Sequence, residues 1–302
     1  MNLSKTIPVI SPGKLDVFHF KEAEVPFPQN DYSEHFHINT LEDVKNKLKF
    51  PIPPHRKTVY DFIFLERGHS VRSKNLIEYK LNKNTFFFLP ANQVSEHNYL
   101  SKDVKGYYCH FSLDLLVQDI RPQELIKEYL FLNSHESPIV QIDRQALVFV
   151  QNILSRLMVE YRKGSKGNLN IFRKYLLALF AELKVFTTNT KDIPKGNAWT
   201  LVENFKELLA MNIYSIQKIT DYAKLLNISP NHLNKCVKKV LGKSSHDLIN
   251  EMLLLESKVL LKQTSLSIKE IAYKIGKSEI SDFDRFFKSQ TGMTPTEFRV
   301  LV

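Results

Sequence analysis

The side chains in this sequence that could do recognisable chemistry gather in two polar stretches near its C-terminal end. Amide, imidazole and basic groups on the outer face of a helix can reach base edges and phosphates in the major groove of DNA. In the first stretch, the residues expected to make such contacts are Ser229, Asn231, His232, Asn234 and Lys235. In the second stretch they are Ser281 and Arg285. Three further lysines are expected to contact phosphates, which position a protein without specifying sequence: Lys238, Lys239 and Lys288.

A predicted helix-turn-helix unit would position the first stretch. Residues 216–225 predict a short helix, and the turn after it ends at Ser229-Pro230. That pair is a favoured helix start, because serine caps the N-terminus and proline suits the first helical position. The small Ala223 would let the two helices cross closely, and Ile228 would fill the corner between them. The second helix ends at a glycine and carries an apolar stripe that must face inward: Leu233, Cys236, Val237 and Val240.

The same unit recurs in residues 267–291, with Gly276 in its turn. Four positions reappear 50 residues later: Leu233, Val237, Lys238 and Gly242 as Phe283, Phe287, Lys288 and Gly292. The expected inner stripe of the second helix is Ile280, Phe283, Phe286 and Phe287. Residues 246–262 predict one helix between the units, roughly 25 Å long at ~1.5 Å per residue. Such a helix could hold two recognition helices about one DNA turn apart, ~34 Å, which favours DNA binding over a plain helical bundle that binds a protein.

Residues 201–299 resemble the DNA-binding domain of the AraC/XylS family of bacterial transcription regulators. The resemblance is carried by residues 267–276, Ser-Ile-Lys-Glu-Ile-Ala-Tyr-Lys-Ile-Gly, and by residues 283–295, Phe-Asp-Arg-Phe-Phe-Lys-Ser-Gln-Thr-Gly-Met-Thr-Pro. It implies a sequence-specific regulator that places two recognition helices in successive major grooves. The N-terminal half is similar, more weakly, to the cupin-like sensor domain of many members, at Pro54-His55-Arg56, Tyr60, Gly68, Pro90 and Gly106-Tyr107.

Three positions depart from the family pattern. Lys277 stands where members usually carry phenylalanine, and it matches Ile228 in the internal repeat. Asp282 stands where they usually carry an aromatic residue, and it would repel phosphates. Met252 replaces a frequent arginine on the long helix. Because a lysine at a packed corner is costly unless its amine reaches solvent, we expect Lys277 and Asp282 to weaken DNA binding.

Short β segments dominate the N-terminal part, in a spacing typical of a barrel or sandwich. The predicted strands cover residues 59–65, 76–81, 85–89 and 104–111. Residues 142–186 predict two amphipathic helices, broken at 164–167, which would either mediate dimerisation or pack internally. Residues 187–199 are typical of a linker. The expected fold class is therefore α+β in three parts: a cupin-like β-barrel sensor domain (1–125), a helical dimerisation segment (126–190) and an all-α double helix-turn-helix domain (197–302).

The resemblance implies a small-molecule effector in the β domain. The candidate pocket residues are Arg56, Tyr60, Phe62, Phe64, His97, Tyr108 and His110. Arg56 could hold a carboxylate or phosphate in bidentate fashion, although the aromatic residues could instead simply fill the core.

A metal-dependent cupin enzyme is the competing interpretation, since His35, His37 and Glu42 have a spacing that could ligate a metal. Against it, Lys57 stands where the usual ligand strand would need a second histidine. We therefore expect no metal, no cofactor and no catalytic residue, and a protein that is not an enzyme.

The composition sets wider bounds on partners and compartment. The chain has 302 residues and a formal net charge of +10, which favours a polyanionic partner. Its two cysteines, Cys109 and Cys236, form no disulfide framework or zinc knuckle and are expected to be reduced. The sequence predicts neither a signal peptide nor a membrane span, so we expect a cytoplasmic location. The expected partners are promoter DNA, RNA polymerase, a small-molecule effector and a second copy of the chain.

Overall fold

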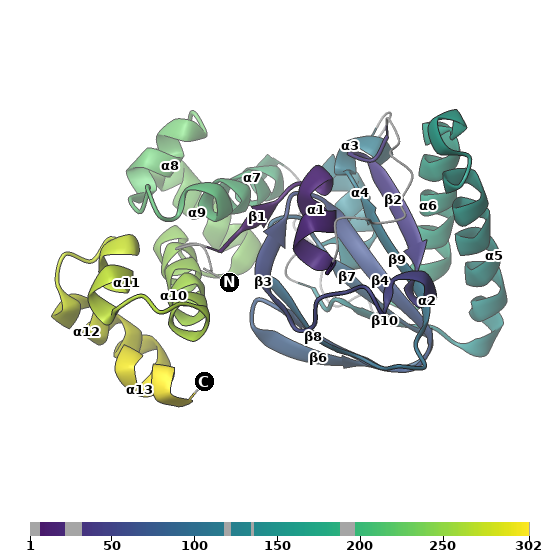
Figure 1. The fold of residues 1–302 in the computed structure, drawn as a ribbon. Coiled ribbons are helices and arrows are strands. Elements are labelled where there is room, and N and C mark those ends of the chain that lie inside the picture. Colours follow the sequence, from purple (N-terminus) through teal and green to yellow (C-terminus); the bar gives the residue numbers. More distant parts are fainter. Residues whose placement is uncertain (1–6, 22–31, 118–121, 134–135, 188–196, 302) are drawn as a thin grey trace. The chain divides into compact units, whose positions relative to one another are not determined.

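The computed structural model describes residues 7–21, 32–117, 122–133, 136–187 and 197–301 (Figure 1). The chain divides into two compact units. The described residues between 9 and 190 form one, which we call the β unit. Those between 197 and 301 form the second, which we call the helical unit, and residues 7–8 are grouped with it. The described residues of the predicted sensor part from 9 onward and those of the predicted helical segment, 126–190, are grouped in the β unit.

The described strands of the β unit form two five-stranded sheets. The first sheet has the order β1-β3-β8-β5-β6, with bounds Val9–Ile10, Ile52–Lys57, Ser95–Leu100, Ser70–Lys74 and Ile77–Leu81. The second has the order β10-β7-β4-β9-β2, with bounds Ile139–Gln141, Thr85–Leu89, Tyr60–Arg67, Lys105–Phe111 and Phe36–Thr40. The four predicted strands are confirmed as β4, β6, β7 and β9. The predicted closed barrel is not found in the described residues, because no strand pairing joins the two sheets into one.

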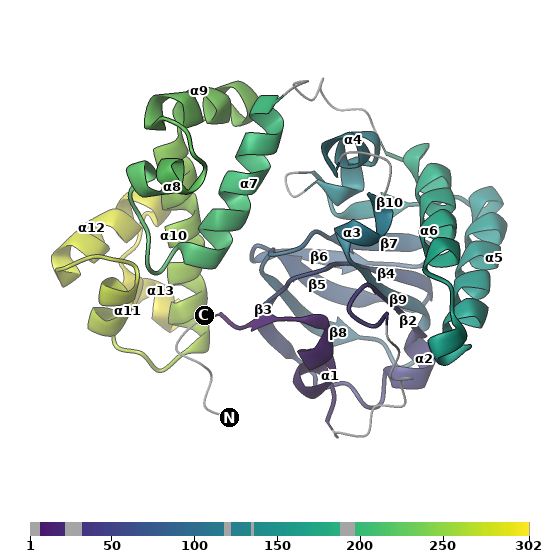
Figure 2. The ribbon, with the colours of Figure 1, turned by 90° about the horizontal axis from the view of Figure 1, so that it is seen from above.

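Two long helices cover the second sheet, α5 (Arg144–Tyr161) and α6 (Leu169–Lys184). Figures 1 and 2 both show them side by side along this sheet. Phe172 of α6 stacks on Phe36 of β2 with ring centroids 4.2 Å apart, and Phe180 packs on Phe88 and Phe111. Aromatic packing of this kind explains why β7, with the sequence Thr-Phe-Phe-Phe-Leu, is buried throughout.

The remaining elements of the β unit are short. They are α1 (Pro12–His19), α2 (Leu41–Val44), α3 (Leu113–Leu116), α4 (Pro122–Glu128) and two 3-10 turns, η1 (Leu130–Leu132) and η2 (Gly164–Lys166). The predicted helix break at 164–167 is confirmed, since η2 separates α5 from α6.

The helical unit contains seven described helices. Their bounds are α7 (Asn197–Asn212), α8 (Ile219–Leu225), α9 (Pro230–Leu241), α10 (Ser245–Gln263), α11 (Ile268–Lys274), α12 (Ile280–Thr291) and α13 (Pro295–Leu301). The predicted linker lies mostly outside the described residues, and its last three positions, 197–199, already belong to α7. No helix among the described residues has the length and apolar content needed to cross a bilayer.

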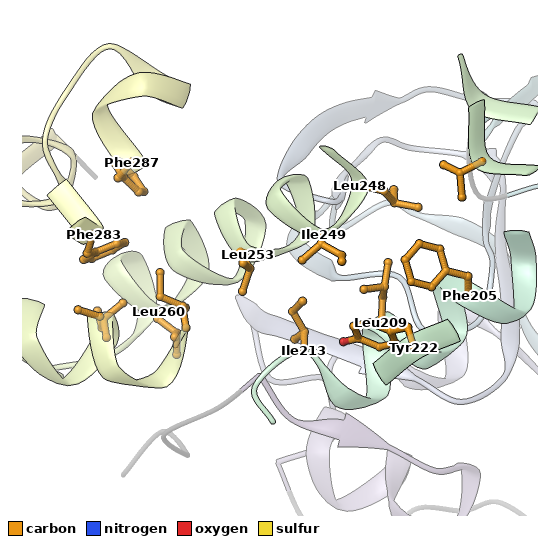
Figure 3. Packing of buried hydrophobic residues seen from close by; sticks show 14 of the residues in the cluster. Phe205, Leu209, Ile213, Tyr222, Leu248, Ile249, Leu253, Leu260, Phe283 and Phe287 are labelled. Atoms are coloured by element: carbon orange, nitrogen blue, oxygen red, sulfur yellow. The ribbon is translucent and has the colours of Figure 1, made fainter. Parts of the chain in front are cut away.

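One apolar core runs along α10 and holds the helical unit together (Figure 3). At one end Leu248 and Ile249 lie near Phe205 of α7, and at the other Leu260 lies near Phe283 of α12. Helix α10 therefore packs against both helix-turn-helix units, which is the connecting role that the sequence predicted for it.

Candidate nucleic-acid interface and effector cavity

The two helix-turn-helix units, α8–α9 and α11–α12, have the same turn geometry. The backbone N–H of Ile228 donates to the carbonyl of Ala223 at 3.0 Å, and that of Lys277 donates to the carbonyl of Ala272 at 2.9 Å. Asn227 and Gly276 take positive φ values of 55° and 73° at equivalent turn positions. Asparagine and glycine are the residues that tolerate this conformation best, so the turn is encoded locally in both copies.

The recognition helices α9 and α12 also end in the same way. Gly242 and Gly292 adopt the left-handed conformation, and their N–H groups donate to the carbonyls of Lys238 and Lys288. The helix starts differ. Ser229 Oγ accepts from the N–H of His232 at 3.2 Å, whereas Glu279 makes no side-chain cap.

The outer faces of the two recognition helices carry a repeated polar stripe. In α9 it consists of Asn231, Lys235 and Lys238, and all three are exposed. In α12 the positions 50 residues later are Ser281, Arg285 and Lys288, which are exposed as well. Spacing of i, i+4 and i+7 places each set on one helix face, opposite the buried stripe. We call these two sets the α9 stripe and the α12 stripe.

The inward stripes follow the sequence prediction with one exception. Leu233, Cys236, Val237, Phe283 and Phe287 are buried, while Val240 and Phe286 are half-buried. Ile280, expected in the inner stripe, is instead 42% exposed, because it occupies the first position of α12, where the helix has not yet met the core.

Other predicted contact residues flank the α9 stripe. His232 and Lys239 are exposed, and His232 Nε2 lies 3.7 Å from the Cys236 thiol. Asn234 is half-buried, and its Oδ1 accepts from the N–H of Ser245 at 3.0 Å at the start of α10. The amide oxygen of Asn234 therefore joins α9 to α10, which leaves its NH2 group as the part that could reach DNA.

The three residues that depart from the family pattern, Lys277, Asp282 and Met252, each have defined contacts. Lys277 is half-buried, and its amine lies 4.9 Å from the centre of the Phe286 ring, so a cation–π contact replaces the apolar filling of the first unit. Asp282 accepts from Arg285 at 2.8 Å. Asp282 therefore engages the guanidinium that the sequence assigned to DNA contact. Met252 packs, half-buried, against the apolar core.

A second candidate site is a cavity of about 60 Å³ inside the β unit. Its lining combines an apolar wall with a cluster of basic and histidine side chains. The apolar lining is Leu15, Phe20, Leu41, Val44, Leu48, Ile52 and Ile63. The polar lining is His19, His37, Asn39, His55, Lys57, Arg72, His97, Tyr108 and His110.

Three of the seven residues predicted for an effector pocket line this cavity: His97, Tyr108 and His110. Phe62 and Phe64 lie in the aromatic core instead, and Tyr60 stacks on Phe111. Arg56 donates from Nε to the carbonyl of Asn92, outside the lining.

The cations that do line the cavity, Lys57 and Arg72, were not predicted from the sequence. Lys57 Nζ lies 2.6 Å from Asp61 Oδ2, and an Arg72 terminal nitrogen lies 3.4 Å from Asp61 Oδ1. All three side chains are buried. The alternation of His55 and Lys57 along β3 could have shown that these two share a face, because side chains two apart on a strand point the same way.

Burial keeps the cavity histidines neutral. It lowers the pKa of His37 to about 4, and burial with the nearby charge of Lys57 lowers the pKa of His55 to about 3. Burial likewise holds the pKa values of His19, His97 and His110 well below the usual range. His37 donates from Nε2 to Asn39 and accepts from the Tyr161 hydroxyl at Nδ1, over 2.9 and 2.6 Å, so its neutral form is fully bonded.

These shifts predict that the β unit loses stability as pH falls below 6.5. The folded pKa values lie below those of the unfolded chain, so the unfolded state binds more protons between about pH 6.5 and 4. Each unit of pKa difference removes about 1.4 kcal/mol. Urea unfolding at several pH values should show this loss, reduced in His37→Gln and unchanged in His69→Gln, an exposed histidine of the same unit. Equal pH dependence in the two variants would contradict the assignment.

The three residues considered as metal ligands have separate partners. His35 Nδ1 contacts Ser112, His37 lines the cavity, and Glu42 accepts from the N–H of Gly106 at 3.1 Å. Within the described ranges no group of three or more His, Cys, Asp or Glu residues is arranged to hold a metal ion. Cys109 and Cys236 are free thiols, both buried.

Comparison with known proteins finds a helix-turn-helix family model, regulatory proteins and solved structures that are similar to this chain. The model of a family described as a helix-turn-helix domain matches residues 222–300. The HTH-type transcriptional activator RhaR of Mannheimia succiniciproducens is 20% identical over 82% of this chain and 87% of its own length. The Msm operon regulatory protein of Streptococcus mutans is 29% identical over 42% of this chain and 44% of its own length. Among solved structures, unsaturated fatty acid-bound ToxT of Vibrio cholerae is 16% identical and covers 89% of this chain and 96% of its own, with a TM-score of 0.38.

Proposed function

Residues 222–300 of this chain are a helix-turn-helix domain of the AraC/XylS type, and from that premise we propose that the protein regulates transcription by sequence-specific binding to duplex DNA. The observation that carries the proposal is the repeated unit itself. The turn recurs 49 positions later, the C-cap and the outer stripe recur 50 positions later, and α10 packs against both units. Two recognition helices on one rigid support suit two successive major grooves of one DNA face.

We also propose how the protein is controlled and how it acts on transcription. A small-molecule effector in the cavity of the β unit would alter DNA binding, and the bound protein would act on RNA polymerase at the promoter. The protein would do this in the bacterial cytoplasm. The names of the relatives, which are transcriptional regulators, support this extension.

Selection of bound sequences from a random duplex pool tests the function. The full chain should enrich a motif with two blocks about 10 base pairs apart, since each recognition helix reads one groove. Absence of any enriched motif, with the helical content intact, would favour the alternative of a regulator that acts through protein contacts.

The second unit should bind DNA more weakly than the first, because acidic groups surround its stripe. Glu279, Asp282 and Asp284 occupy the positions where the first unit has Ser229, His232 and Asn234. We expect the double variant Asp282→Asn, Asp284→Asn to bind duplex DNA about three- to tenfold more tightly, with a steeper salt dependence.

Fluorescence anisotropy with a selected duplex measures this change. The matched control is Asp103→Asn, Asp114→Asn, which removes the same charge from exposed sites of the β unit. Equal tightening in both variants would indicate a general charge effect and would contradict a local role for the acidic residues.

A second copy of the chain is proposed to cover the outer face of α5. Val148, Phe149 and Val159 are 56%, 58% and 54% exposed there. Apolar side chains grouped on one helix face commonly mark an interface.

We expect Phe149→Glu to weaken dimerisation at least about tenfold, as loss of a central aromatic anchor usually does. Analytical ultracentrifugation would measure the dimer dissociation constant. The control variant is Ile77→Glu, which places the same charge at an exposed site on β6. A wild-type chain that is monomeric at all concentrations would refute the interface.

A further inference from the structure

We propose that the cavity of the β unit binds a compact organic anion, with its carboxylate or phosphate group held at Lys57 and Arg72. This inference deepens the proposed function, on which the regulatory meaning of such binding rests. The binding itself follows from the chemistry of the cavity: its charge, the unpaired polar atoms of its lining side chains and its size.

The charge of the cavity lining favours an anion. The described lining contains two cations, Lys57 and Arg72, and no carboxylate. Asp61, which contacts both cations and is not part of the lining, balances one positive charge and leaves one in excess. An excess charge in a buried site is costly unless an opposite charge joins it. An anion in the cavity would supply that charge, whereas a metal cation would be repelled.

Two polar atoms of the lining lack hydrogen-bond partners. Arg72 is 3% exposed, and its Nε has no hydrogen-bond partner among the described residues. A buried donor without a partner is costly, and a guanidinium is well suited to carboxylate or phosphate oxygens. His110 Nδ1 also lacks a partner within the described residues, while the Nε2 of that ring lies 3.3 Å from the carbonyl of Ser33. Both atoms belong to side chains that line the cavity, so these side chains have hydrogen-bonding capacity that the described residues leave unused.

The size and shape of the cavity limit the ligand to a small one. The free volume of about 60 Å³ is several times the ~10–15 Å³ that one water needs, so the cavity has room for a ligand of a few heavy atoms. Leu41, Val44 and Ile52 contribute to a wall that offers no hydrogen bonds, which suits a short apolar body. The structure thus favours a compact anion with a few carbon atoms over both a long chain and a neutral polar ligand.

Calorimetric titration of the full chain, without DNA, tests the inference with matched probes. Isobutyrate and methyl phosphate carry the two anionic groups, and isobutyramide is the neutral counterpart of the first. We expect at least one anion to bind at least about tenfold more tightly than isobutyramide, and the better of the two identifies the preferred group. Arg72→Gln should weaken anion binding about tenfold or more. Arg67→Gln, which removes an exposed arginine of the same unit, should leave it unchanged.

Two results would overturn the inference. One is that neither isobutyrate nor methyl phosphate binds more tightly than isobutyramide, and the other is no binding of either anion at about 10 mM, a concentration that would reveal even weak complexes. The comparison of acid with amide uses the wild-type chain and therefore stands even if Arg72→Gln fails to fold. DNA binding is measured separately, so a chain that binds the anion but no duplex would refute the proposed function and leave the anion site intact.

Discussion

Replacement of Asp61 by leucine will destabilise the β unit by about 3–5 kcal/mol, because it leaves two buried cations without their shared carboxylate. Asp61 is fully buried in β4 and contacts both Lys57 and Arg72. Loss of one partner from a buried ionic group is more damaging than loss of the whole group, since the remaining charge stays away from water. Hydrogen exchange of peptides that cover β4, residues 60–67, would report the stability of this unit directly.

Two further variants separate this effect from a general one. Asp103→Leu removes an exposed carboxylate that pairs with Arg67, and its effect should stay within about 0.5 kcal/mol. The double variant Asp61→Leu, Lys57→Met should recover part of the lost stability, because one uncompensated charge is then removed with its partner. If the double variant is no more stable than Asp61→Leu, the loss stems from packing and not from charge.

The helical unit could be predicted from sequence in detail because its determinants are local. The cap at Ser229, the turn at Gly276 and the stops at Gly242 and Gly292 each depend on a few neighbouring residues. The internal repeat then supplied a second, independent indication of the same pattern. Ile280 was misplaced because periodicity cannot tell where along a helix the core begins.

The β unit was predicted less completely because its determinants lie far apart in the chain. Strands β5 and β8, Ser70–Lys74 and Ser95–Leu100, are rich in polar residues and show no strand pattern in the sequence. Both strands nevertheless begin with buried polar side chains. Arg72 of β5 lies opposite His97 of β8 in the strand register, and both residues line the cavity. Which arginine faces the cavity depends on this long-range register, so Arg56 was chosen where the structure has Arg72.

Lys277 and Asp282, the two departures from the family pattern that were expected to weaken DNA binding, differ in their contacts. Lys277 was expected to disturb the corner of the second unit, yet its stem packs while its amine lies over Phe286. Its effect on DNA binding should therefore be smaller than that of Asp282, which pairs directly with Arg285. The two departures differ in mechanism, although the sequence presented them as one.

Removal of both lysines from the α9 stripe, Lys235→Ala with Lys238→Ala, should weaken binding of a selected duplex about ten- to hundredfold at ~0.1 M salt. Each lysine is exposed on the outer face of α9, opposite the buried stripe. Because removal of one phosphate-binding cation lowers the salt slope by about 0.9, the slope should fall by about 2 in the double variant. Anisotropy titrations at several salt concentrations measure both quantities.

The matched control, Lys80→Ala with Lys83→Ala, removes the same charge from exposed sites of the β unit and should change the affinity little. The equivalent α12 variant, Arg285→Ala with Lys288→Ala, should have a smaller effect than the α9 variant, because Asp282 already engages Arg285. Since the two stripes are related by the internal repeat, this comparison holds geometry constant and varies the surrounding charge. A larger effect of the α12 variant would refute the weakening role of Glu279, Asp282 and Asp284, but it would leave duplex binding by the repeated unit in place. If neither variant changed the affinity, the two stripes would not be the DNA-binding surface.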